Sequence, residues 1–338
     1  MSRGKGRALN RWSTMKLPLL DIIIVNWNSG TQLRRCLSSV SAAARDGVQL
    51  DRVVVVDNNS HDGSASELDS LHLPLQVIYN RDNLGFAKAC NQGAEGSRAD
   101  YLLFLNPDIQ LLEASLRDPL RWMEMPEHHL FGVLGIQLVS ESGEISRTCA
   151  RFPTPGRLLL QSLGFDRLFP FLPLAHFMVK WNHGDSREVD QVMGAFFLVR
   201  REVFESVRGF DERFFVYYED VDFAYRSRKA GWLSYYYAQA RAVHKGGGTT
   251  SQIKGRRLFY FLRGRILYCR KHFGLAAAIA LLATTFFLEP VVRIMHCVWQ
   301  RRSSAVEDVI QGYRMLWTSR KSLIELLWEH DEHESVAS

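Results

Sequence analysis

An amide and a carboxylate follow an apolar run in the stretch FLNPDIQ, residues 104–110. Proline cannot donate a hydrogen bond to a neighbouring strand, so the strand that YLLFL predicts should end by Asn106. Asp108 would then lie just beyond the carboxyl end of that strand, which is where open α/β sheets bind their ligands. Asn-Pro-Asp is also ordinary turn chemistry, so this stretch alone does not separate a ligand site from a polar turn.

Polar side chains follow each of the first four apolar runs of the chain. The runs at 20–27, 52–57, 75–80 and 101–106 are solidly apolar and predict strands of a parallel sheet that is buried on both faces. Helical patterns follow the strands, including a short one after NNSHDG, and complete β–α–β units. The polar residues at the strand ends are Asn26 and Asn28, Asp57 and Asn58, Asn80 and Asp82, and Asn106 and Asp108. We expect them to face one crevice.

A second set of elements follows a segment with little periodicity. Residues 140–190 are rich in proline and aromatic side chains, and we expect them to make a long excursion over the sheet. GAFFLV (194–199) and LSYYYAQARAVH (233–244) predict strands. Between them, EDVDFAYRSRKAG (219–231) begins with acids, ends with bases and closes on glycine, an order that favours a helix with a glycine cap.

The sequence lacks the signatures of several other classes of protein. No GxGxxG or GxxxxGK[ST] pattern is present, so neither a nicotinamide-type nor a P-loop nucleotide site is encoded. Five scattered cysteines without CxxC spacing argue against a zinc site or a disulfide framework and fit a reducing cytosol. The basic residues 1–16 lack the apolar core of a signal peptide. We therefore expect a cytoplasmic protein.

Positive charge is concentrated near the C-terminus. The chain carries a formal charge of +6, and residues 251–302 hold ten Lys or Arg against one acid, Glu289. The apolar run 275–288 in this segment is shorter than the roughly 20 residues that a membrane-spanning helix needs. A basic segment beside a short apolar run favours attachment to an anionic membrane surface, and a buried core or interface helix is the alternative. No RNP-type or helix-turn-helix signature points to nucleic acid.

Five motifs in order resemble family 2 glycosyltransferases, specifically the bacterial rhamnosyltransferase-like branch. They are VVVVDNNSHDGS, NLGFAKACNQG, YLLFLNPDI, GAFFLVRREVFESVRGFDERFFVYYEDVDFAYR and AVHKGGG. FLRGRILYCRKHFG (261–274) is similar to a segment that follows the catalytic domain in that branch, so the resemblance covers roughly residues 20–275. It implies an α/β fold: a single GT-A-type nucleotide-sugar-binding domain with a mostly parallel central sheet, plus a helical, basic C-terminal extension.

With this resemblance, we expect the chain to have three parts. A basic tail covers residues 1–18, a glycosyltransferase catalytic domain covers 19–250, and a helical, membrane-associated region covers 251–338. Within the catalytic domain, the nucleotide-binding part would be 19–140 and the acceptor part 141–250.

The resemblance places several residues around a nucleotide sugar. Asp57 resembles the residue that accepts a hydrogen bond from N3–H of a pyrimidine base, and an Asx turn with the asparagines after it is the alternative. Asn26, at the end of the first strand, joins this set. Asn83 and Gly85 form the family's NxG motif, which shapes the donor pocket; capping of the next helix is an equal alternative. Gly194-Ala195 would border donor and acceptor, or simply belong to a core strand.

The resemblance also implies a metal site beside the donor diphosphate. Asp108 corresponds to the second acid of the family's DxD motif, and Asn106 replaces the first acid. Diphosphate favours Mg²⁺ or Mn²⁺, which take oxygen ligands and often need only one or two carboxylates. His244 resembles a family histidine that can add a nitrogen ligand, which suits Mn²⁺ better than Mg²⁺. Lys245 beside it could contact phosphate as a point charge.

The general base implied by the resemblance is Asp220, in the family's ED position. Such a carboxylate takes the proton of the acceptor hydroxyl. Glu219 and Asp222 compete for this role. Asp222 precedes Arg226 by four residues, so its alternative role is an ion pair on the helix. Glu219 could instead only favour the positive end of the helix.

The function implied by the resemblance is an inverting transfer of a sugar to a hydroxyl group. The donor would be dTDP-L-rhamnose, with UDP-galactofuranose, UDP-galactose or UDP-glucose as alternatives. A lipid-linked cell-envelope saccharide at the cytoplasmic face of the inner membrane is the expected acceptor, because the basic segment would attract an anionic polyprenyl diphosphate. We expect Asp57, Asp108 and Asp220 to converge on one sugar diphosphate. The sequence leaves a homo-oligomer open.

Two other functions compete with this interpretation. A processive polysaccharide synthase would carry QxxRW, whereas QGYRM (311–315) lacks tryptophan directly after the arginine. A non-catalytic, membrane-associated partner could keep the fold, and the missing first acid of the DxD motif is its support. The acids and the histidine named above favour the enzyme.

Overall fold

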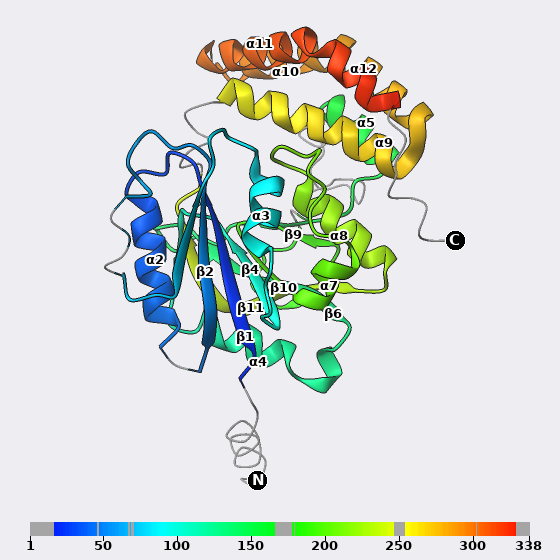
Figure 1. Ribbon diagram of the computed structural model, residues 1–338. Coiled ribbons are helices and arrows are strands. Elements are labelled where there is room, and N and C mark those ends of the chain that lie inside the picture. The colour runs from blue at the N-terminus through cyan, green and yellow to red at the C-terminus, as the bar shows by residue number, and fades with distance from the viewer. Residues whose placement is uncertain are drawn as a thin grey trace.

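A nine-stranded sheet forms the centre of the part of the chain that the structure describes (Figure 1). This computed structural model describes residues 17–328, except 46, 67, 69–70, 166–177, 179, 247–253 and 302. Most of the expected tail 1–18, and the expected boundary between residues 250 and 251, lie outside the described residues.

The sheet is mixed but mostly parallel. Its path contains, in order, β3 (Leu75–Tyr79), β2 (Gln49–Asp57), β1 (Leu19–Asn26), β4 (Tyr101–Leu105), β10 (Phe196–Arg200), β6 (Phe131–Val139), β11 (Leu233–His244) and β5 (Ile109–Leu111), and β8 (Arg187–Val189) also pairs with β11. Parallel pairing joins β3, β2, β1 and β4, and also joins β6 to β11. β10, β5 and β8 are antiparallel to their neighbours. The predicted mostly parallel sheet is confirmed.

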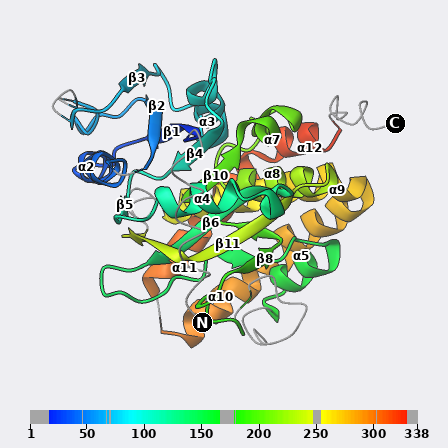
Figure 2. The ribbon, with the colours of Figure 1, turned by 90° about the horizontal axis from the view of Figure 1, so that it is seen from below.

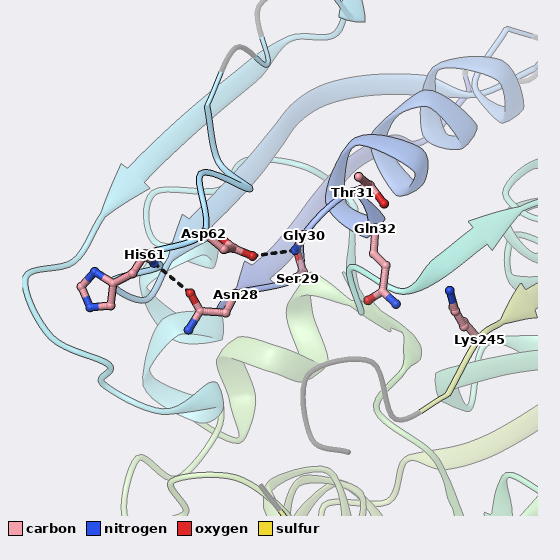
Figure 3. A pocket seen from close by; sticks show the side chains of 8 residues that line it. All are labelled: Asn28, Ser29, Gly30, Thr31, Gln32, His61, Asp62 and Lys245. Atoms are coloured by element: carbon pink, nitrogen blue, oxygen red, sulfur yellow. Dashed lines mark hydrogen bonds between the residues drawn. The ribbon is translucent and has the colours of Figure 1, made fainter. Parts of the chain in front are cut away.

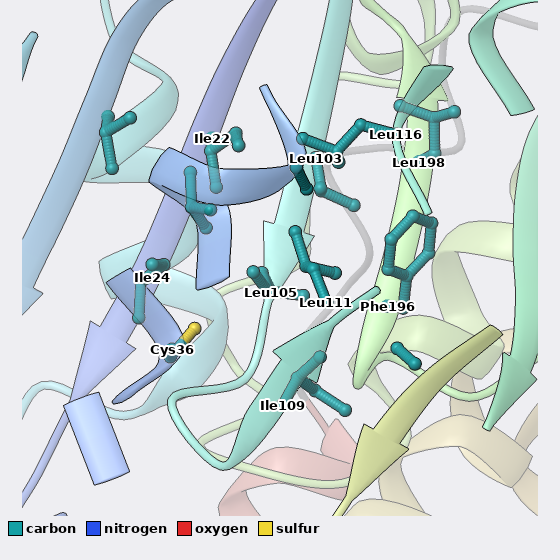
Figure 4. Close-up of a cluster of buried hydrophobic side chains, with 14 of the residues drawn as sticks. Ile22, Ile24, Cys36, Leu103, Leu105, Ile109, Leu111, Leu116, Phe196 and Leu198 are labelled. Carbon is teal, nitrogen blue, oxygen red and sulfur yellow. The ribbon is translucent and has the colours of Figure 1, made fainter. Parts of the chain in front are cut away.

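Helices cover both faces of the sheet, which is why its strands are solidly apolar. α2 (Gln32–Ala43) lies on one face, where its Cys36 and Leu37 join side chains of β1, β4, β5 and β10 in one buried cluster (Figure 4). α3 (Phe86–Ala94) lies on the opposite side of β1 and β2 (Figure 2). α7 (Arg201–Ser206) and α8 (Glu219–Lys229) contribute Phe204 and Phe223 to the cluster on the same face as α3.

Residues 140–190 contain more regular structure than expected. β7 (Cys149–Ala150) pairs with β9 (Gln191–Val192) in a separate two-stranded sheet, and α5 (Pro155–Ser162) packs against the C-terminal helices. The sequence also gave no indication of α4 (Arg117–Met123) or of the short 3₁₀ helix η2 (Pro126–His128). The short helix expected after NNSHDG is not formed in the described residues 58–66, which make turns and bends.

The C-terminal helices form a layer over the carboxyl ends of the parallel strands (Figure 1). They are α9 (Lys254–Phe287), α10 (Glu289–Trp299), α11 (Ser303–Thr318) and α12 (Arg320–Trp328). α9 is broken at Gly274, where φ is 81° and ψ is 178°. Among the described residues, α9 is the one helix that is long and apolar enough to cross a membrane by those two criteria alone, and 33% of its apolar window is buried inside the protein. The sequence had not indicated a helix of this length.

The apolar run 275–288 is partly a core segment. Ala278 and Leu281 are buried among the other C-terminal helices and α5, whereas Ile279 and Phe287 are exposed. One face of this helical segment therefore packs inside the protein, as expected for a buried core or interface helix. Its other face is open.

α9 lies directly against the turn that precedes α8, residues 215–218. Gly264 of α9 is so close that a β-carbon at this position would lie 2.8 Å from the backbone oxygen of Tyr217. Tyr217 and Tyr218 both have left-handed backbones, with φ of 70° and 73°. Because such conformations are strained for large side chains, they persist only where the surroundings hold them. The contact with α9 is part of that support.

We predict that Gly264→Ala destabilises the protein, although alanine is the better helix former. Helix propensity alone favours alanine by about 1 kcal/mol. The new β-carbon would have to displace the backbone of Tyr217, and overpacking of this kind costs about 1–3 kcal/mol. Urea unfolding should show a lower midpoint, and turnover should fall with it because the turn leads directly into α8.

The matched control is Gly156→Ala in α5, where a β-carbon would meet no atom within 4 Å among the described residues. This variant should be unchanged or slightly stabilised. Equal behaviour of the two variants would show that the close approach of α9 to the turn has no energetic weight.

Candidate functional site

A cavity of about 1230 Å³ lies between the carboxyl ends of the strands and the C-terminal helices. We call it the central cavity. Of the residues singled out from the sequence, its wall contains Asn83, Gly85, Asn106, Asp108, Gly194, Ala195, Asp220 and His244. Three of the others lie elsewhere: Asn26, Asp57 and Lys245.

Strand pairing brings Asp108 and His244 together although they are far apart in the sequence. β5 pairs with the end of β11 so that Ile109 lies opposite His244, and the backbone N–H of Lys245 donates to the backbone oxygen of Asp108 at 3.3 Å. Oδ2 of Asp108 lies 3.3 Å from Nε2 of His244, and both side chains are largely buried. One carboxylate and one imidazole thus face the cavity at one place.

This pair fits a divalent cation that is shared with a diphosphate. Among the described residues, no group of three or more His, Cys, Asp or Glu side chains could hold a metal by itself. Asp108 and His244 would supply one oxygen and one nitrogen, and Asn106 adds an amide to the same wall. Mg²⁺ and Mn²⁺ commonly take remaining ligands from phosphate oxygens and water. The donor set fits such an ion only together with its substrate.

Asp220 stands at the start of α8 with its carboxylate oriented by backbone groups. The N–H of Gly194 donates to Oδ2 at 2.8 Å, and the N–H of Val221 donates to Oδ1 at 2.8 Å. Gly194 leaves little room for a side chain here, because a β-carbon at this position would lie 3.3 Å from Oδ2 of Asp220. Burial raises the pKa of Asp220 above the ordinary carboxyl value, and the two N–H donors limit that rise. Asp220 lines the cavity and is only partly buried.

The NxG motif forms a tight turn against residues 215–218. Oδ1 of Asn83 accepts a hydrogen bond from the N–H of Gly85 at 3.0 Å. Gly85 has a φ of 88°, and a β-carbon there would lie 2.5 Å from the backbone oxygen of Phe215. The same oxygen accepts from the N–H of Phe86 at 2.5 Å. Glycine is therefore required by conformation and by space, and the motif connects the start of α3 to the turn before α8.

Asp57 lies behind the cavity wall rather than in it. Its side chain is 4% exposed, with Oδ1 accepting from Nδ2 of Asn26 at 2.7 Å and Oδ2 accepting from the N–H of Ser60 at 3.0 Å. Asn26 is itself fully buried. Parallel pairing of β1 with β2 places these two residues opposite each other, so their polar groups satisfy one another. The expected convergence on one cavity holds for Asp108 and Asp220 but not for Asp57; the next residue, Asn58, lines the wall instead.

Lys245 faces a second, smaller pocket of about 510 Å³ beside the first strand-to-helix turn (Figure 3). The side chains of Asn28, His61 and Asp62 lie in the same pocket. Oδ2 of Asp62 accepts from the N–H of Gly30 at 2.7 Å, and Oδ1 of Asn28 accepts from the N–H of His61 at 2.8 Å. Because His244 lines the central cavity and Lys245 lines this one, the end of β11 lies between the two.

The family of the chain follows from comparison with known proteins. The model of glycosyl transferase family 2 matches residues 21–208, which is more than half of the chain. The chain belongs to this family. Asp220 and His244 lie C-terminal to the matched segment, so their roles depend on the geometry described above.

Relatives and a solved structure agree with this assignment. N-acetylglucosaminyl-diphospho-decaprenol L-rhamnosyltransferase from Mycobacterium tuberculosis is 28% identical over 253 residues, covering 69% of this chain and 78% of the relative. Rhamnosyltransferase WbbL from Escherichia coli is 28% identical over 146 residues, covering 43% and 52%. A mannosyltransferase from Pyrobaculum calidifontis, solved with GDP-Man and Mn²⁺, has a TM-score of 0.51 at 15% identity, covering 95% of this chain and 91% of that one. The predicted GT-A-type fold is confirmed.

Three neighbouring acids of this family 2 glycosyltransferase have different environments. Glu219 is 6% exposed, its Oε2 has no hydrogen-bond partner among the described residues, and burial together with Asp220 raises its pKa well above the ordinary value. Asp222 is fully buried and contacts Arg226, Lys271 and His272. Although burial alone would raise the pKa of Asp222, these partners hold it far below its ordinary value.

These environments separate the candidate bases. Burial and the neighbouring Asp220 favour the protonated form of Glu219, which is a poor base, and an Asp222 carboxylate stabilised by cations accepts a proton poorly. Asp220 has a carboxylate that is oriented and partly accessible; burial raises its pKa, and hydrogen bonds from two backbone N–H groups oppose that rise. Of the three, it alone has the properties that a general base needs.

A group of basic residues in the cavity wall was not singled out from the sequence. The group contains Arg147, Lys254, Arg256, Arg257 and Arg293. All except Arg147 belong to the basic segment 251–302, for which the sequence favoured attachment to a membrane surface. The high charge of that segment was the only feature of the sequence that could have indicated these residues. The structure places part of that charge around the cavity.

Ion pairs to α9 hold the region that precedes α8. Asp211 contacts Arg213, and the Lys271 ammonium of α9 contacts both Asp211 and Asp222 at 2.7 and 2.8 Å. Although burial alone would raise the pKa of Asp211, the Arg213 hydrogen bonds and the Lys271 charge lower it to about 2. A folded-state pKa below the unfolded value means that the carboxylate stabilises the protein above pH 4 and loses this effect as the pH falls towards 2.

We predict that Asp211→Asn lowers the free energy of unfolding by about 2 kcal/mol at pH 7. The difference from the unmodified protein should shrink as the pH falls from about 4 to about 2, where the aspartate becomes protonated in both states. Urea unfolding at several pH values measures both quantities.

Glu205→Gln is the matched control, because the Glu205 side chain is 57% exposed in its pair with Arg201. Such a surface pair contributes less than about 0.5 kcal/mol. A destabilisation by Asp211→Asn that stayed constant down to pH 2 would contradict the electrostatic origin of the effect.

Proposed function

We propose that the protein is an inverting, nucleotide-sugar-dependent glycosyltransferase that acts on a lipid-linked or cell-envelope saccharide. One observation carries this proposal: the oriented carboxylate of Asp220 lines the same cavity as the adjacent Asp108 and His244. Direct displacement at an anomeric carbon needs a base for the incoming hydroxyl and positive charge for the departing diphosphate. Asp220 would supply the base, and a cation at Asp108 and His244 would supply the positive charge, within one cavity.

Asp220 serves as the base in the proposed reaction. Its carboxylate takes the proton of the acceptor hydroxyl while the hydroxyl oxygen bonds to the anomeric carbon of the donor. The bond from that carbon to the diphosphate oxygen breaks, and the nucleoside diphosphate leaves with the electron pair. Inversion follows because the two oxygens occupy opposite faces of the sugar. The hydrogen bonds from Gly194 and Val221 fix the direction of the carboxylate.

Asp108 and His244 would hold a Mg²⁺ or Mn²⁺ ion together with the donor diphosphate. When bound, the ion supplies charge neutralisation for the leaving group, which is commonly the largest catalytic contribution in such reactions. The Mn²⁺ in the solved mannosyltransferase supports this assignment. Lys245 follows His244 in the sequence and lines the neighbouring smaller pocket, from which its ammonium group would add positive charge near the diphosphate.

The proposed donor is dTDP-L-rhamnose. The printed names of the Mycobacterium tuberculosis and Escherichia coli relatives, both rhamnosyltransferases, support it. A UDP-linked hexose or galactofuranose is the alternative. The nucleotide would lie near Asn58, Asn83 and the smaller pocket, where polar groups collect at the ends of the first strands. Asp57 would act from behind this wall through the backbone of Ser60.

The proposed acceptor is carried by a lipid at the cytoplasmic face of a membrane. The diphospho-decaprenol in the name of the Mycobacterium tuberculosis relative supports a lipid diphosphate. The basic, partly apolar C-terminal helices above the cavity support a peripheral position at the membrane. In this proposal, residues 19–250 carry the chemistry and residues 251–338 position the acceptor.

We predict that Asp220→Asn lowers turnover at least about a hundredfold, because it removes the base but keeps the shape of the side chain. Binding of the nucleotide sugar should stay near normal. In the unmodified enzyme, the acid limb of kcat/KM against pH should lie above the ordinary aspartate pKa of about 3.9, since burial raises the pKa of Asp220. Steady-state release of the nucleoside diphosphate measures all three quantities.

The matched control is Glu202→Gln, because Glu202 also lies in the first turn of a helix but is exposed and outside the cavity wall. Its turnover should not change. Near-normal turnover of Asp220→Asn would remove this residue from the mechanism, whereas an absence of turnover in the unmodified protein would favour a non-catalytic role.

A second prediction concerns the metal pair. dTDP-L-rhamnose should raise the melting temperature more in the presence of Mn²⁺ than in its absence, because a ligand that binds only the folded state stabilises it. Asp108→Asn and His244→Ala should abolish this Mn²⁺-dependent increment. His129→Ala, at an exposed histidine outside both pockets, should keep it.

The same thermal-shift measurement compares donors. UDP-galactose, UDP-glucose and UDP-galactofuranose form the comparison panel, and a larger shift with one of them would replace rhamnose in the proposal. An increment that survives in both the Asp108 and the His244 variant would show that the cation is held elsewhere.

A further inference from the structure

Five residues in the wall of the central cavity have no role in the proposed donor site. They are Arg147, Gln161, Gln191, Met193 and Arg293. We call this set the acceptor lobe. Pairing of β7 with β9, and a hydrogen bond of 2.9 Å from the N–H of Met193 to the backbone oxygen of Thr148, carry Arg147 to the wall beside Gly194 and Asp220. Arg147 and Met193 of the lobe therefore lie close to the base, on segments other than those that hold Asp108 and His244.

A buried network fixes Arg293 in this wall. Glu289 is 1% exposed and accepts from Nε and Nη2 of Arg293 at 2.9 and 2.7 Å. The same carboxylate contacts Arg265, which is fully buried and also donates to Oγ1 of Thr285 at 2.8 Å. Two guanidinium groups thus share one carboxylate. The network carries one uncompensated positive charge, and Arg293 is its member in the cavity wall.

Burying such a network costs desolvation free energy, and the stability of the fold does not require one of its arginines to line a cavity. Buried charges require full compensation, and apolar residues of similar size are often as stable. Here the fully buried Arg265 holds Glu289, and Glu289 in turn orients Arg293. An oriented arginine with excess positive charge is a suitable ligand for phosphate oxygens, which it can contact through two parallel hydrogen bonds. The arrangement favours an anion in the lobe.

The opposite face of α10 is apolar and open. Leu288, Val291, Met295, Val298 and Trp299 are between 50% and 75% exposed. Their spacing of three, four, three and one residues places them on one side of the helix. Arg293 is two residues from both Val291 and Met295, and positions two apart point about 200° away from each other on a helix. α10 therefore separates an exposed apolar surface from the charged cavity.

The geometry points to a binding site for the diphosphate of a lipid-linked acceptor. In this proposal, which rests on the proposed function, Arg147 and Arg293 contact the diphosphate in the acceptor lobe. The apolar face of α10 lies in the surface of the membrane that carries the lipid chain. The acceptor sugar then extends from the diphosphate towards Asp220.

A membrane is the occupant of the apolar face that the described residues favour. The apolar face and Arg293 lie on opposite sides of the same helix, so a lipid beside that face would have a cationic site for its charged end nearby. Arg301, two residues after the end of α10, is exposed, and so are Arg314 on α11 and Lys321 on α12, so the C-terminal helices offer positive charge to anionic headgroups. Trp299 at the end of the stripe is a side chain typical of the interface between lipid and water.

The binding test uses the full chain and farnesyl diphosphate in titration calorimetry, with and without saturating dTDP and Mn²⁺. We expect farnesyl diphosphate to bind in both conditions, because the donor and acceptor diphosphates occupy different parts of the cavity. The double variant Arg147→Gln, Arg293→Gln should weaken this binding by at least about tenfold through loss of charge-assisted hydrogen bonds. Its affinity for dTDP should not change.

Arg228→Gln is the control, because Arg228 forms an exposed pair with Glu188 away from the cavity. Its affinity for farnesyl diphosphate should equal that of the unmodified protein. Displacement of farnesyl diphosphate by dTDP, or weaker dTDP binding in the double variant, would assign the two arginines to the donor and overturn the proposal. Calorimetry requires no sugar transfer, so a failure of the proposed reaction is distinguished from a failure of this site.

The membrane face is tested by flotation with vesicles of phosphatidylethanolamine and phosphatidylglycerol. Met295→Glu combined with Trp299→Glu should abolish flotation and leave the affinity for farnesyl diphosphate unchanged. Leu130→Glu, at a leucine that is 49% exposed before β6, should float normally. Flotation that persists in the double variant would show that another surface binds the membrane, or that the face of α10 belongs to a protein partner.

Discussion

The turn at residues 215–218 is the constraint on which the site depends. Its two consecutive left-handed tyrosines place the start of α8, and with it Asp220, against the end of the sheet. Neither tyrosine favours this conformation, so the turn must be held from outside. The NxG motif supports it through the backbone oxygen of Phe215, and α9 supports it through Gly264. Two glycines far apart in sequence therefore allow the close approach that keeps α8 in position.

The cavity combines strong charges of both signs at short range. At one end, a carboxylate and an imidazole are suited to a cation with phosphate. In the middle, burial favours the neutral form of Glu219, and backbone N–H groups orient Asp220. Asp222 lies behind the wall, where basic partners stabilise its carboxylate. Elsewhere in the wall, Arg147 and Arg293 are suited to an anion.

Much of the fold could be predicted from the sequence because its signals are local. The parallel strands follow from solid apolar runs, and α8 follows from its charge order and closing glycine. β6 was missed because its glycines weaken the strand pattern; Gly135 is needed where a β-carbon would lie 2.8 Å from Val192. The pairing of β5 with β11 and the side-by-side position of Asn26 and Asp57 depend on register between distant segments. The positions of Arg147 and Arg293 in one cavity wall depend on tertiary packing for the same reason.

The thickness of α10 has a geometric consequence. An α-helix with its side chains is about 10 Å across, so the acceptor lobe would stand about that far above the hydrocarbon boundary if the apolar face rests on it. A diphosphate bound at Arg293 would then lie at the height of the lipid headgroups. The helix would act as a spacer between the hydrocarbon of the membrane and the charged cavity.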